Sequence, residues 1–333
     1  MKKILVLLVV MLLAVTACSS PAASKEYKVG TYAMTAEPTV TPAAEKDGKV
    51  SDAKAQYSVV LVTVLLEDDV VKAINIDEAQ NSATVNAEGV ATVPTETPTK
   101  DEKKDAYNMR KASPIQKEWF EQIDALEAFL VGKKVEEVKG YKLDSDGVIE
   151  ADVKSSVTIQ LNDIMATVVK AIDAAEKVEG APVKIGASSA TTVKDTPVTA
   201  DKAGKLAFDT NFSAVVLDKD GKVLHAYVDV MQNEVAYDAE GVLSAATKRD
   251  SKEIRKEDYG MLKASPISKE WYEQATAYEA FLVGKTAADI KGVALEDGKP
   301  TGDLASSVTI IVTGLQDSVL KSIEKAADLQ AAK

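Results

Sequence analysis

The sequence predicts an α+β protein made of two tandem homologous domains, in each of which helices pack on a small antiparallel sheet. One observation behind this prediction is an internal repeat, because residues 107–122 recur as residues 259–274, 152 positions later. Another is a set of β-branched runs upstream of each copy. A third is the helical spacing of apolar residues downstream. A repeat of this length indicates whole domains rather than solenoid units.

The first residues of the chain indicate export and anchoring. Residues 1–17 join Lys2 and Lys3 to an apolar run too short to span a membrane, which is typical of a signal peptide. Residues 15–18, Val-Thr-Ala-Cys, resemble the lipobox of bacterial lipoproteins. The resemblance implies lipidation of Cys18 and a place on the extracytoplasmic face of the cell membrane. A plain secretory signal with a chance cysteine is the alternative.

Two segments have the composition of connections. Residues 18–55 are rich in Ala, Ser, Thr, Pro and Lys, which predicts a flexible tether with at most a short strand at residues 27–32. Residues 180–210 have a similar composition and are expected to link the domains, with one possible strand at residues 182–185. The domains themselves are predicted at residues 56–179 and 211–330.

Charge and two rare residue types exclude several classes of function. The chain has 52 acidic and 40 basic residues, a formal net charge of −12, which disfavours binding to nucleic acids and anionic lipids. A single cysteine and a single histidine exclude a Cys/His zinc site, an iron–sulfur cluster and a Ser-His-Asp triad. The histidine, His225, lies in an alternating run and is expected to be an ordinary strand residue.

Each predicted domain begins with strands. Residues 57–66 are almost continuously apolar and β-branched. In the second copy, residues 212–217 and 222–231 flank an Asp-Lys-Asp-Gly segment, and an Asp-Gly turn between two such runs predicts a hairpin. A further turn at Glu88-Gly89, repeated at Glu240-Gly241, predicts a third strand and so a small meander.

The repeated stretch predicts the start of a helix. Ser113 or Ser265 is expected to cap it, the proline that follows each serine fits the first helical position, and Gln116 completes a capping-box pattern. An apolar stripe then faces the core, and Gly132 or Gly284 ends the helix. The stripe consists of Ile115, Trp119, Ile123, Leu126 and Leu130.

A second repeated segment follows this helix in each copy. A short helical turn at residues 135–138 or 286–290 leads to the pattern D-x-x-S-S-V-T, which begins at Asp152 and again at Asp303. Apolar residues at helical spacing then predict a last helix in each domain. They are Ile164, Val168, Ile172 and Ala175 in the first copy and Leu315, Val319, Ile323 and Ala326 in the second.

This combination resembles the FMN-binding domain of bacterial membrane-anchored lipoproteins and redox-driven pump subunits, over most of residues 57–329. In that family a flavin transferase attaches FMN through its phosphate to the threonine of a pattern close to D-x-x-[ST]-[GS]-A-T. The resemblance implies FMN attachment at Thr158 and Thr309. The matching residues are Asp152, Ser155, Ser156 and Thr158 in the first copy and Asp303, Ser306, Ser307 and Thr309 in the second.

The chain departs from the family pattern at one position in each copy. Val157 and Val308 stand where the family has a small alanine, next to the threonine that would be modified. A partial match at residues 188–191, Ser-Ser-Ala-Thr, lacks the aspartate and is interpreted as part of the linker. The bland alternative for both D-x-x-S-S-V-T segments is a loop whose Ser and Thr side chains satisfy backbone groups and cap the last helix.

Aromatic side chains of the repeated stretch could stack on a flavin ring. Tyr107 and Tyr259 are candidates for this role, whereas Trp119 and Trp271 lie on the apolar stripe and are expected to be core anchors. The methionines at positions 109 and 261 are expected to fill the space around the ring.

The function predicted from these features is electron transfer by a lipid-anchored protein that carries one FMN per domain. The resemblance implies a flavin transferase and a membrane electron donor as partners. The alternative is a flavin-free surface lipoprotein that uses the same scaffold to bind a ligand or partner. A hydrolase would need a carboxylate pair, and Glu118 with Glu121, or Glu270 with Glu273, is interpreted as a solvated helix face. No catalytic constellation or metal site is therefore predicted.

Overall fold

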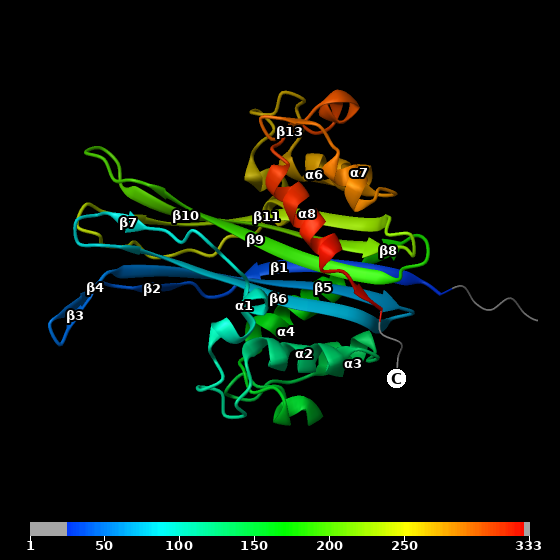
Figure 1. The fold of residues 1–333 in the computed structure, drawn as a ribbon, viewed down its shortest axis with the longest axis horizontal. Helices are drawn as coiled ribbons and strands as arrows, with labels where there is room; N and C mark the ends of the chain where they lie inside the picture. Colours follow the sequence, from blue (N-terminus) through cyan, green and yellow to red (C-terminus); the bar gives the residue numbers. More distant parts are fainter. Residues whose placement is uncertain (1–24, 330–333) are drawn as a thin grey trace, which may run out of the picture.

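The computed structural model describes residues 25–329 and confirms the α+β class (Figure 1). Two antiparallel sheets lie face to face in the middle of the molecule, and helices cover the outer face of each (Figure 1). We call residues 25–178 the first half and residues 184–329 the second half. The predicted signal peptide and Cys18 lie outside the described residues.

The first half supplies one sheet, with strand order β7-β6-β5-β1-β8 and with β2 paired to β5. Strand β1 pairs with β5 along its whole length, from Tyr27 opposite Glu67 to Thr35 opposite Val59. A separate hairpin, β3 with β4, precedes β5. The strands are β1 (Tyr27–Thr35), β2 (Thr39–Thr41), β3 (Ala44–Lys46), β4 (Lys49–Ser51), β5 (Ala53–Glu67), β6 (Val70–Val85), β7 (Ala91–Thr92) and β8 (Glu176–Val178).

The second half supplies the other sheet, with order β11-β10-β9-β14. The predicted Asp-Gly turn joins β10 to β11: the Asp218 N–H donates to the Lys222 carbonyl at 2.9 Å, and Gly221 has a φ of +72°. A small hairpin, β12 with β13, lies apart. The strands are β9 (Lys184–Thr196), β10 (Gly204–Leu217), β11 (Val223–Tyr237), β12 (Leu295–Glu296), β13 (Lys299–Pro300) and β14 (Ala327–Asp328).

The helical segments follow the long strands in the same order in each half. Those of the first half are α1 (Lys100–Lys103), η1 (Lys104–Tyr107), α2 (Trp119–Leu130), α3 (Val135–Gly140), η2 (Asp152–Ser155) and α4 (Asn162–Asp173). Those of the second half are α5 (Lys252–Arg255), η3 (Lys256–Tyr259), α6 (Trp271–Leu282), α7 (Ala287–Lys291), η4 (Gly302–Ser306) and α8 (Thr313–Glu324). The predicted short helix and last helix of each copy are thus confirmed.

The two halves share a core between their sheets. The rings of Tyr57 in β5 and Phe208 in β10 lie 4.9 Å apart, and the Tyr57 hydroxyl donates to the Glu234 carbonyl at 2.8 Å. Farther along, Asn233 Nδ2 donates to Thr35 Oγ1 at 3.0 Å. Each buried cluster between the sheets contains residues of both halves. Folding of one half therefore buries apolar surface of the other.

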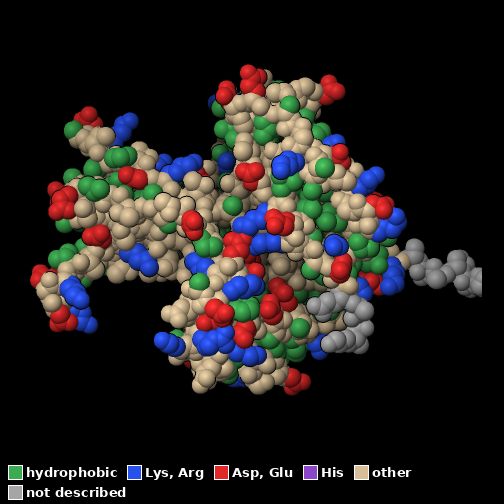
Figure 2. All heavy atoms as spheres, viewed as in Figure 1, with side chains coloured by type: hydrophobic (Ala, Val, Ile, Leu, Met, Phe, Trp, Pro, Cys, Tyr) green, Lys and Arg blue, Asp and Glu red, His purple; other side chains and the backbone are tan. Residues whose placement is uncertain are grey.

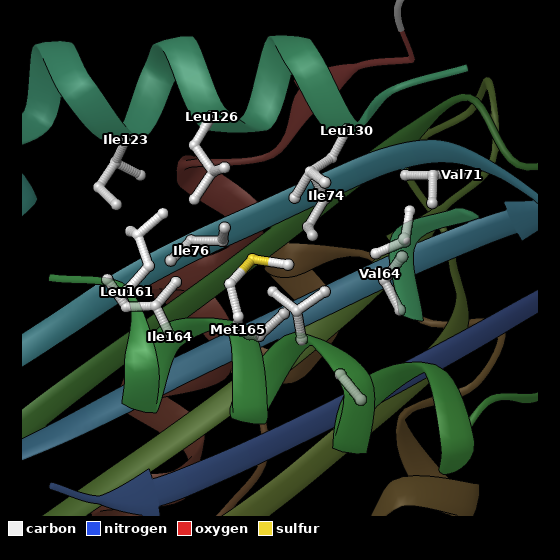
Figure 3. Close-up of a cluster of buried hydrophobic side chains, with 14 of the residues drawn as sticks. Val64, Val71, Ile74, Ile76, Ile123, Leu126, Leu130, Leu161, Ile164 and Met165 are labelled. Atoms are coloured by element: carbon white, nitrogen blue, oxygen red, sulfur yellow. The ribbon is translucent and has the colours of Figure 1, made fainter. Parts of the chain in front are cut away.

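Each half also has a core of its own between its sheet and its helices. In the first half, side chains of α2 and α4 point toward one another over β5 and β6, as Figure 3 shows for Leu126 and Met165. The part of the predicted stripe formed by Ile123, Leu126 and Leu130 is buried there. In the second half, α6 and α8 cover β10 and β11 in the same way.

Strands overlap the places where the sequence allowed them, residues 27–32 and 182–185, but they are longer than expected, so most of the predicted tether and linker is not flexible connection. Residues 27–35 form β1, which lies between β5 and β8, and residues 184–196 form β9, which lies beside β10. The third strand expected after Glu88-Gly89 is only the two-residue β7. The partial match at residues 188–191 is accordingly a buried part of β9.

Close helix packing explains why these strands have the composition of a linker. A Cβ at Gly30 would lie 1.8 Å from the Ala171 carbonyl oxygen of α4, and a Cβ at Gly186 would lie 2.1 Å from the Ser322 carbonyl oxygen of α8. Next to Gly186, the buried Ser188 hydroxyl donates to the Ser318 carbonyl at 2.8 Å. The small residues thus allow a helix to approach the sheet and do not indicate flexibility.

The start of the repeated helix lies later than predicted. Helix α2 begins at Trp119 with Glu118 as its N-cap, and α6 begins at Trp271 with Glu270 as its N-cap. Gln116 has a φ of +55°, and the equivalent Ser268 has a φ of +52°, so a helix cannot run through either residue. The segment around Ser113 is a turn.

The remaining predictions concern His225 and the surface charge. His225 lies in β11, as predicted, and burial lowers its pKa to about 4, so that it is neutral at pH 7. Figure 2 shows acidic and basic side chains mixed over the visible face rather than gathered by sign.

Candidate functional site

A buried glutamine joins the two repeated segments of the first half. Gln122, in α2, has no exposed surface. Its Oε1 accepts the backbone N–H of Thr158 at 2.8 Å and the Thr158 hydroxyl at 3.2 Å. Its Nε2 donates to Ser113 Oγ at 3.2 Å. The helix, the turn before it and the D-x-x-S-S-V-T segment are therefore held together by one side chain.

The second half repeats this arrangement. Gln274 Oε1 accepts the backbone N–H of Thr309 at 2.7 Å and the Thr309 hydroxyl at 3.0 Å, and Gln274 Nε2 donates to Ser265 Oγ at 3.1 Å. Gln274 also has no exposed surface. The two threonines singled out by the sequence thus occupy equivalent and defined positions.

The glutamates at the helix starts are structural rather than solvated. Glu118 is 2% exposed, and its carboxylate accepts the backbone N–H groups of Met109 at 2.8 Å and Arg110 at 3.0 Å. Glu270 accepts the N–H groups of Met261 and Leu262 at 2.8 and 2.9 Å. The sequence interpretation was wrong because the turn before the helix folds back over it and brings free backbone donors to the carboxylate.

A pocket of about 310 Å³ lies beside this network in the first half. The Lys100 ammonium lies 5.2 Å from the centre of the Tyr107 ring and 5.5 Å from that of the Trp119 ring. It also forms an ion pair with Glu78 at 2.7 Å. The lining residues are Ala36, Val60, Glu78, Lys100, Tyr107, Met109, Trp119, Ile159, Gln160, Asn162, Asp163 and Ile164.

A pocket of about 320 Å³ occupies the equivalent place in the second half. The Lys252 ammonium lies 4.9 Å from the centre of the Tyr259 ring and 5.3 Å from that of the Trp271 ring. Thr309 itself lines this pocket. The other lining residues are Lys252, Tyr259, Met261, Ala264, Ser265, Pro266, Trp271, Lys299, Ile310 and Ile311.

The aromatic predictions can be placed against these pockets. Tyr107 and Tyr259 are half-buried and line them, as do the two methionines. Trp119 and Trp271 are each 3% exposed and belong to the cores, as predicted. Each tryptophan also forms part of a pocket wall, so core anchor and pocket residue are one and the same.

Apart from Thr309, the residues of the two D-x-x-S-S-V-T segments, Thr158 included, are not among the pocket-lining residues. Asp152 and Ser155 are exposed at the two ends of η2, and Asp303 and Ser306 are exposed in η4. Ser306 Oγ donates to the Asp303 carbonyl at 2.7 Å, a contact internal to that turn. Ser156 and Ser307 are half-buried at the ends of the two turns.

The valines that depart from the family pattern are core residues. Val157 and Val308 have no exposed surface, and each belongs to the apolar cluster of its own half. Thr158 and Thr309 beside them are half-buried. The valine side chain therefore adds no bulk at the surface next to the threonine.

Two pairs of residues at the candidate site were missed in the sequence, one pair lining the pockets and the other holding the threonines. Lys100 and Lys252 are separated by the same 152 positions as the repeat, but they precede residues 107–122 and 259–274, in which the repeat is most evident. Gln122 and Gln274 are the last residues of these two ranges, and nothing in the sequence distinguishes them from other helix residues. Their role depends on contacts 36 and 35 residues away.

A third repeated contact ties each helix to its sheet. Glu127 Oε1 accepts the Ile76 N–H at 2.6 Å, and Glu279 Oε1 accepts the Val228 N–H at 2.8 Å. Burial raises the pKa of each carboxyl to about 8. Both side chains are thus largely protonated at neutral pH.

No protein-family model matches the chain, and searches of the curated proteins and of the solved structures return no match. Within residues 25–329, three or more His, Cys, Asp or Glu side chains nowhere gather in a way that could hold a metal ion. In the same part of the chain, no helix has the length and apolar character needed to cross a bilayer.

Proposed function

We propose that the protein is a lipid-anchored, extracytoplasmic flavoprotein that carries electrons through FMN held in the pocket of each half. The observation that carries the proposal is the recurrence of one pocket, built from a lysine, a tyrosine, a tryptophan and a methionine, beside an equivalent threonine in both halves. Such a recurrence is expected of a duplicated binding site.

The residues present fit a flavin. The two volumes lie near the lower end of the range of about 300–1,000 Å³ seen for small-molecule pockets. In the second half, Tyr259 and Trp271 offer ring surface, Lys252 offers a positive charge for a phosphate, and Thr309 offers a hydroxyl. Bound FMN supplies the redox chemistry, and the protein holds its phosphate, covers a ring face and sets its potential.

Hydrogen bonds hold each candidate threonine in a defined orientation. Each backbone N–H and hydroxyl is bound to a glutamine that has no exposed surface, so the threonine cannot turn freely. The hydroxyl oxygen retains lone pairs for a further partner. Val157 and Val308 lie in the cores, so they do not argue against access of a flavin transferase.

One observation favours the alternative, a flavin-free lipoprotein that binds a ligand or partner. In the first half, the Lys100 ammonium already has a counter-ion in Glu78 at 2.7 Å, with both side chains only 10% exposed. A lysine neutralised in this way needs no phosphate.

The test begins with protein purified with its anchor from a host that contains the flavin transferase. After denaturation, in-gel flavin fluorescence and intact mass report covalent FMN, and dialysis against FMN before denaturation reports noncovalent FMN. Thr158→Val and Thr309→Val are each expected to remove one covalent flavin. Thr158→Ser and Thr309→Ser, which keep the hydroxyl, are the matched controls. An unmodified mass together with no retained FMN would reject the flavoprotein.

A further inference from the structure

The two pockets share their aromatic rings but differ in charge. The first-half pocket is lined by one lysine, Lys100, and by two carboxylates, Glu78 and Asp163. The second-half pocket is lined by two lysines, Lys252 and Lys299, and its lining contains no carboxylate. The pocket walls therefore sum to about −1 in the first half and +2 in the second, when each side chain has its usual charge.

This difference comes from three positions of the repeat. Val230 stands 152 positions after Glu78, and Gly314 stands 151 positions after Asp163, so both carboxylates are lost in the second half. Lys299, in β13, stands 151 positions after Val148, so this lysine is added. The offset of 151 is that of the D-x-x-S-S-V-T segments.

The equivalent pocket lysines, Lys100 and Lys252, consequently have different surroundings. Lys100 is paired with Glu78, whereas Lys252 and Lys299 form no ion pair within residues 25–329. Val230 is buried in the cluster that contains Trp271. The ammonium of the half-buried Lys252, held over two rings, can therefore pair with an anion from outside the protein.

We propose that the two pockets differ in ligand selectivity: the second-half pocket selects aromatic ligands that carry a phosphate or a similar strong anion, and the first-half pocket does not. The identity of the ring as a flavin rests on the function proposed above, but the charge selectivity does not. For flavins, the second-half pocket distinguishes FMN from riboflavin, and the first-half pocket binds the two about equally.

The chain offers a separate reporter for each pocket, because its two tryptophans are Trp119 and Trp271. With excitation selective for tryptophan, Trp119→Phe leaves tryptophan fluorescence from the second-half pocket alone, and Trp271→Phe leaves it from the first-half pocket alone. Each full-length variant is titrated with FMN and with riboflavin at fixed ionic strength. Parallel titrations use phenyl phosphate and phenol, which carry the same contrast of charge on a smaller ring.

At Trp271, FMN is expected to bind about tenfold or more tightly than riboflavin, the scale of one charge-assisted contact. Lys252→Met should remove most of this preference for FMN and should change the affinity for riboflavin by less than about threefold. Lys299→Met should reduce the preference for FMN as well. At Trp119, the two flavins should bind within about threefold of each other. Glu78→Gln, which frees Lys100, should introduce a preference for FMN there.

The outcomes separate the inference from the proposed function. An equal ratio of FMN affinity to riboflavin affinity at both tryptophans would overturn the charge selectivity, but it would leave the proposed flavoprotein function unaffected. Absence of flavin binding, with phenyl phosphate still bound at Trp271 and lost in Lys252→Met, would retain the selectivity and reject the flavin. Absence of any phosphate-dependent binding at Trp271 would overturn the inference.

Discussion

Gln274 Oε1 accepts both the backbone N–H of Thr309, at 2.7 Å, and the hydroxyl of the same threonine, at 3.0 Å. The equivalent contacts join Gln122 to Thr158. In each half, a glutamine without exposed surface therefore fixes the threonine on which the flavin hypothesis depends. The two repeated segments of the sequence are one structural unit in each half.

Replacement of this glutamine tests its structural role. Gln274→Leu should lower the free energy of unfolding by about 2–3 kcal/mol, because the Thr309 N–H and the Ser265 hydroxyl lose a buried partner. Urea unfolding of the full chain measures the change. Gln160→Leu, at an exposed glutamine, is the control and should change stability by less than about 0.5 kcal/mol. Equal effects of the two substitutions would show that the network contributes no stability.

The strand assigned to residues 184–196 can be tested through Gly186. Gly186→Ala should destabilise the protein by about 3 kcal/mol or more, since the added Cβ would lie 2.1 Å from the Ser322 carbonyl oxygen. Gly140→Ala, which meets nothing within 4 Å, is the matched control and should be neutral. Thermal unfolding compares the two variants. A tolerated Gly186→Ala would mean that this segment is a linker after all.

The turn before each helix should depend on its buried glutamate. Glu118→Gln leaves one of the Met109 and Arg110 N–H groups facing the side-chain NH2 group, which cannot accept, so stability should fall by about 1–3 kcal/mol. Amide hydrogen exchange at these two residues should become faster. The exposed Glu136→Gln serves as the control. Unchanged exchange at both residues would contradict the capping role.

Buried acids should make stability fall as pH rises. Burial raises the pKa of Glu279 from 4.5 to about 8, and burial also raises the pKa of Glu253 to about 7 and that of Asp229 to about 6. Because each folded-state pKa exceeds its unfolded value, the folded state holds more protons. The stability associated with Glu279 is complete below about pH 4.5 and is lost as pH rises through about 8.

Glu279→Gln isolates this effect. The amide oxygen can still accept the Val228 N–H, but the group no longer titrates. The variant should be more stable than the wild type at pH 8, by about 1–3 kcal/mol, and the difference should shrink toward pH 5. Urea unfolding across this range checks it. A pH-independent difference would indicate that Glu279 does not titrate in the folded protein.

The sequence predicted elements whose residues have a regular apolar period, and it failed where close contact replaced that period. The last helices follow from Ile164, Val168 and their equivalents, and the hairpin follows from its Asp-Gly turn. Beyond the possible strand at residues 182–185, strand β9 was missed because Gly186 and its small neighbours pack against a helix that begins 127 residues later, at Thr313. Such long-range packing leaves no local periodicity.

The site shows the same division. Tyr107, Tyr259 and the two threonines were found through the repeat and the resemblance, and the structure places them at or beside the pockets. Lys100 and Lys252 recur at the repeat offset, but the residues around them in the sequence do not identify them as pocket residues. The charge difference between the halves could not be seen until the structure brought Glu78 against Lys100.

A crystal structure of the full-length chain grown with FMN would show directly whether the two pockets bind the flavin. We expect isoalloxazine density against Tyr259 and Trp271, with the phosphate within hydrogen-bonding distance of Lys252 or Thr309. Occupancy in the second half should equal or exceed that in the first. Empty pockets at saturating FMN, or a flavin bound away from these residues, would contradict flavin binding in the two pockets.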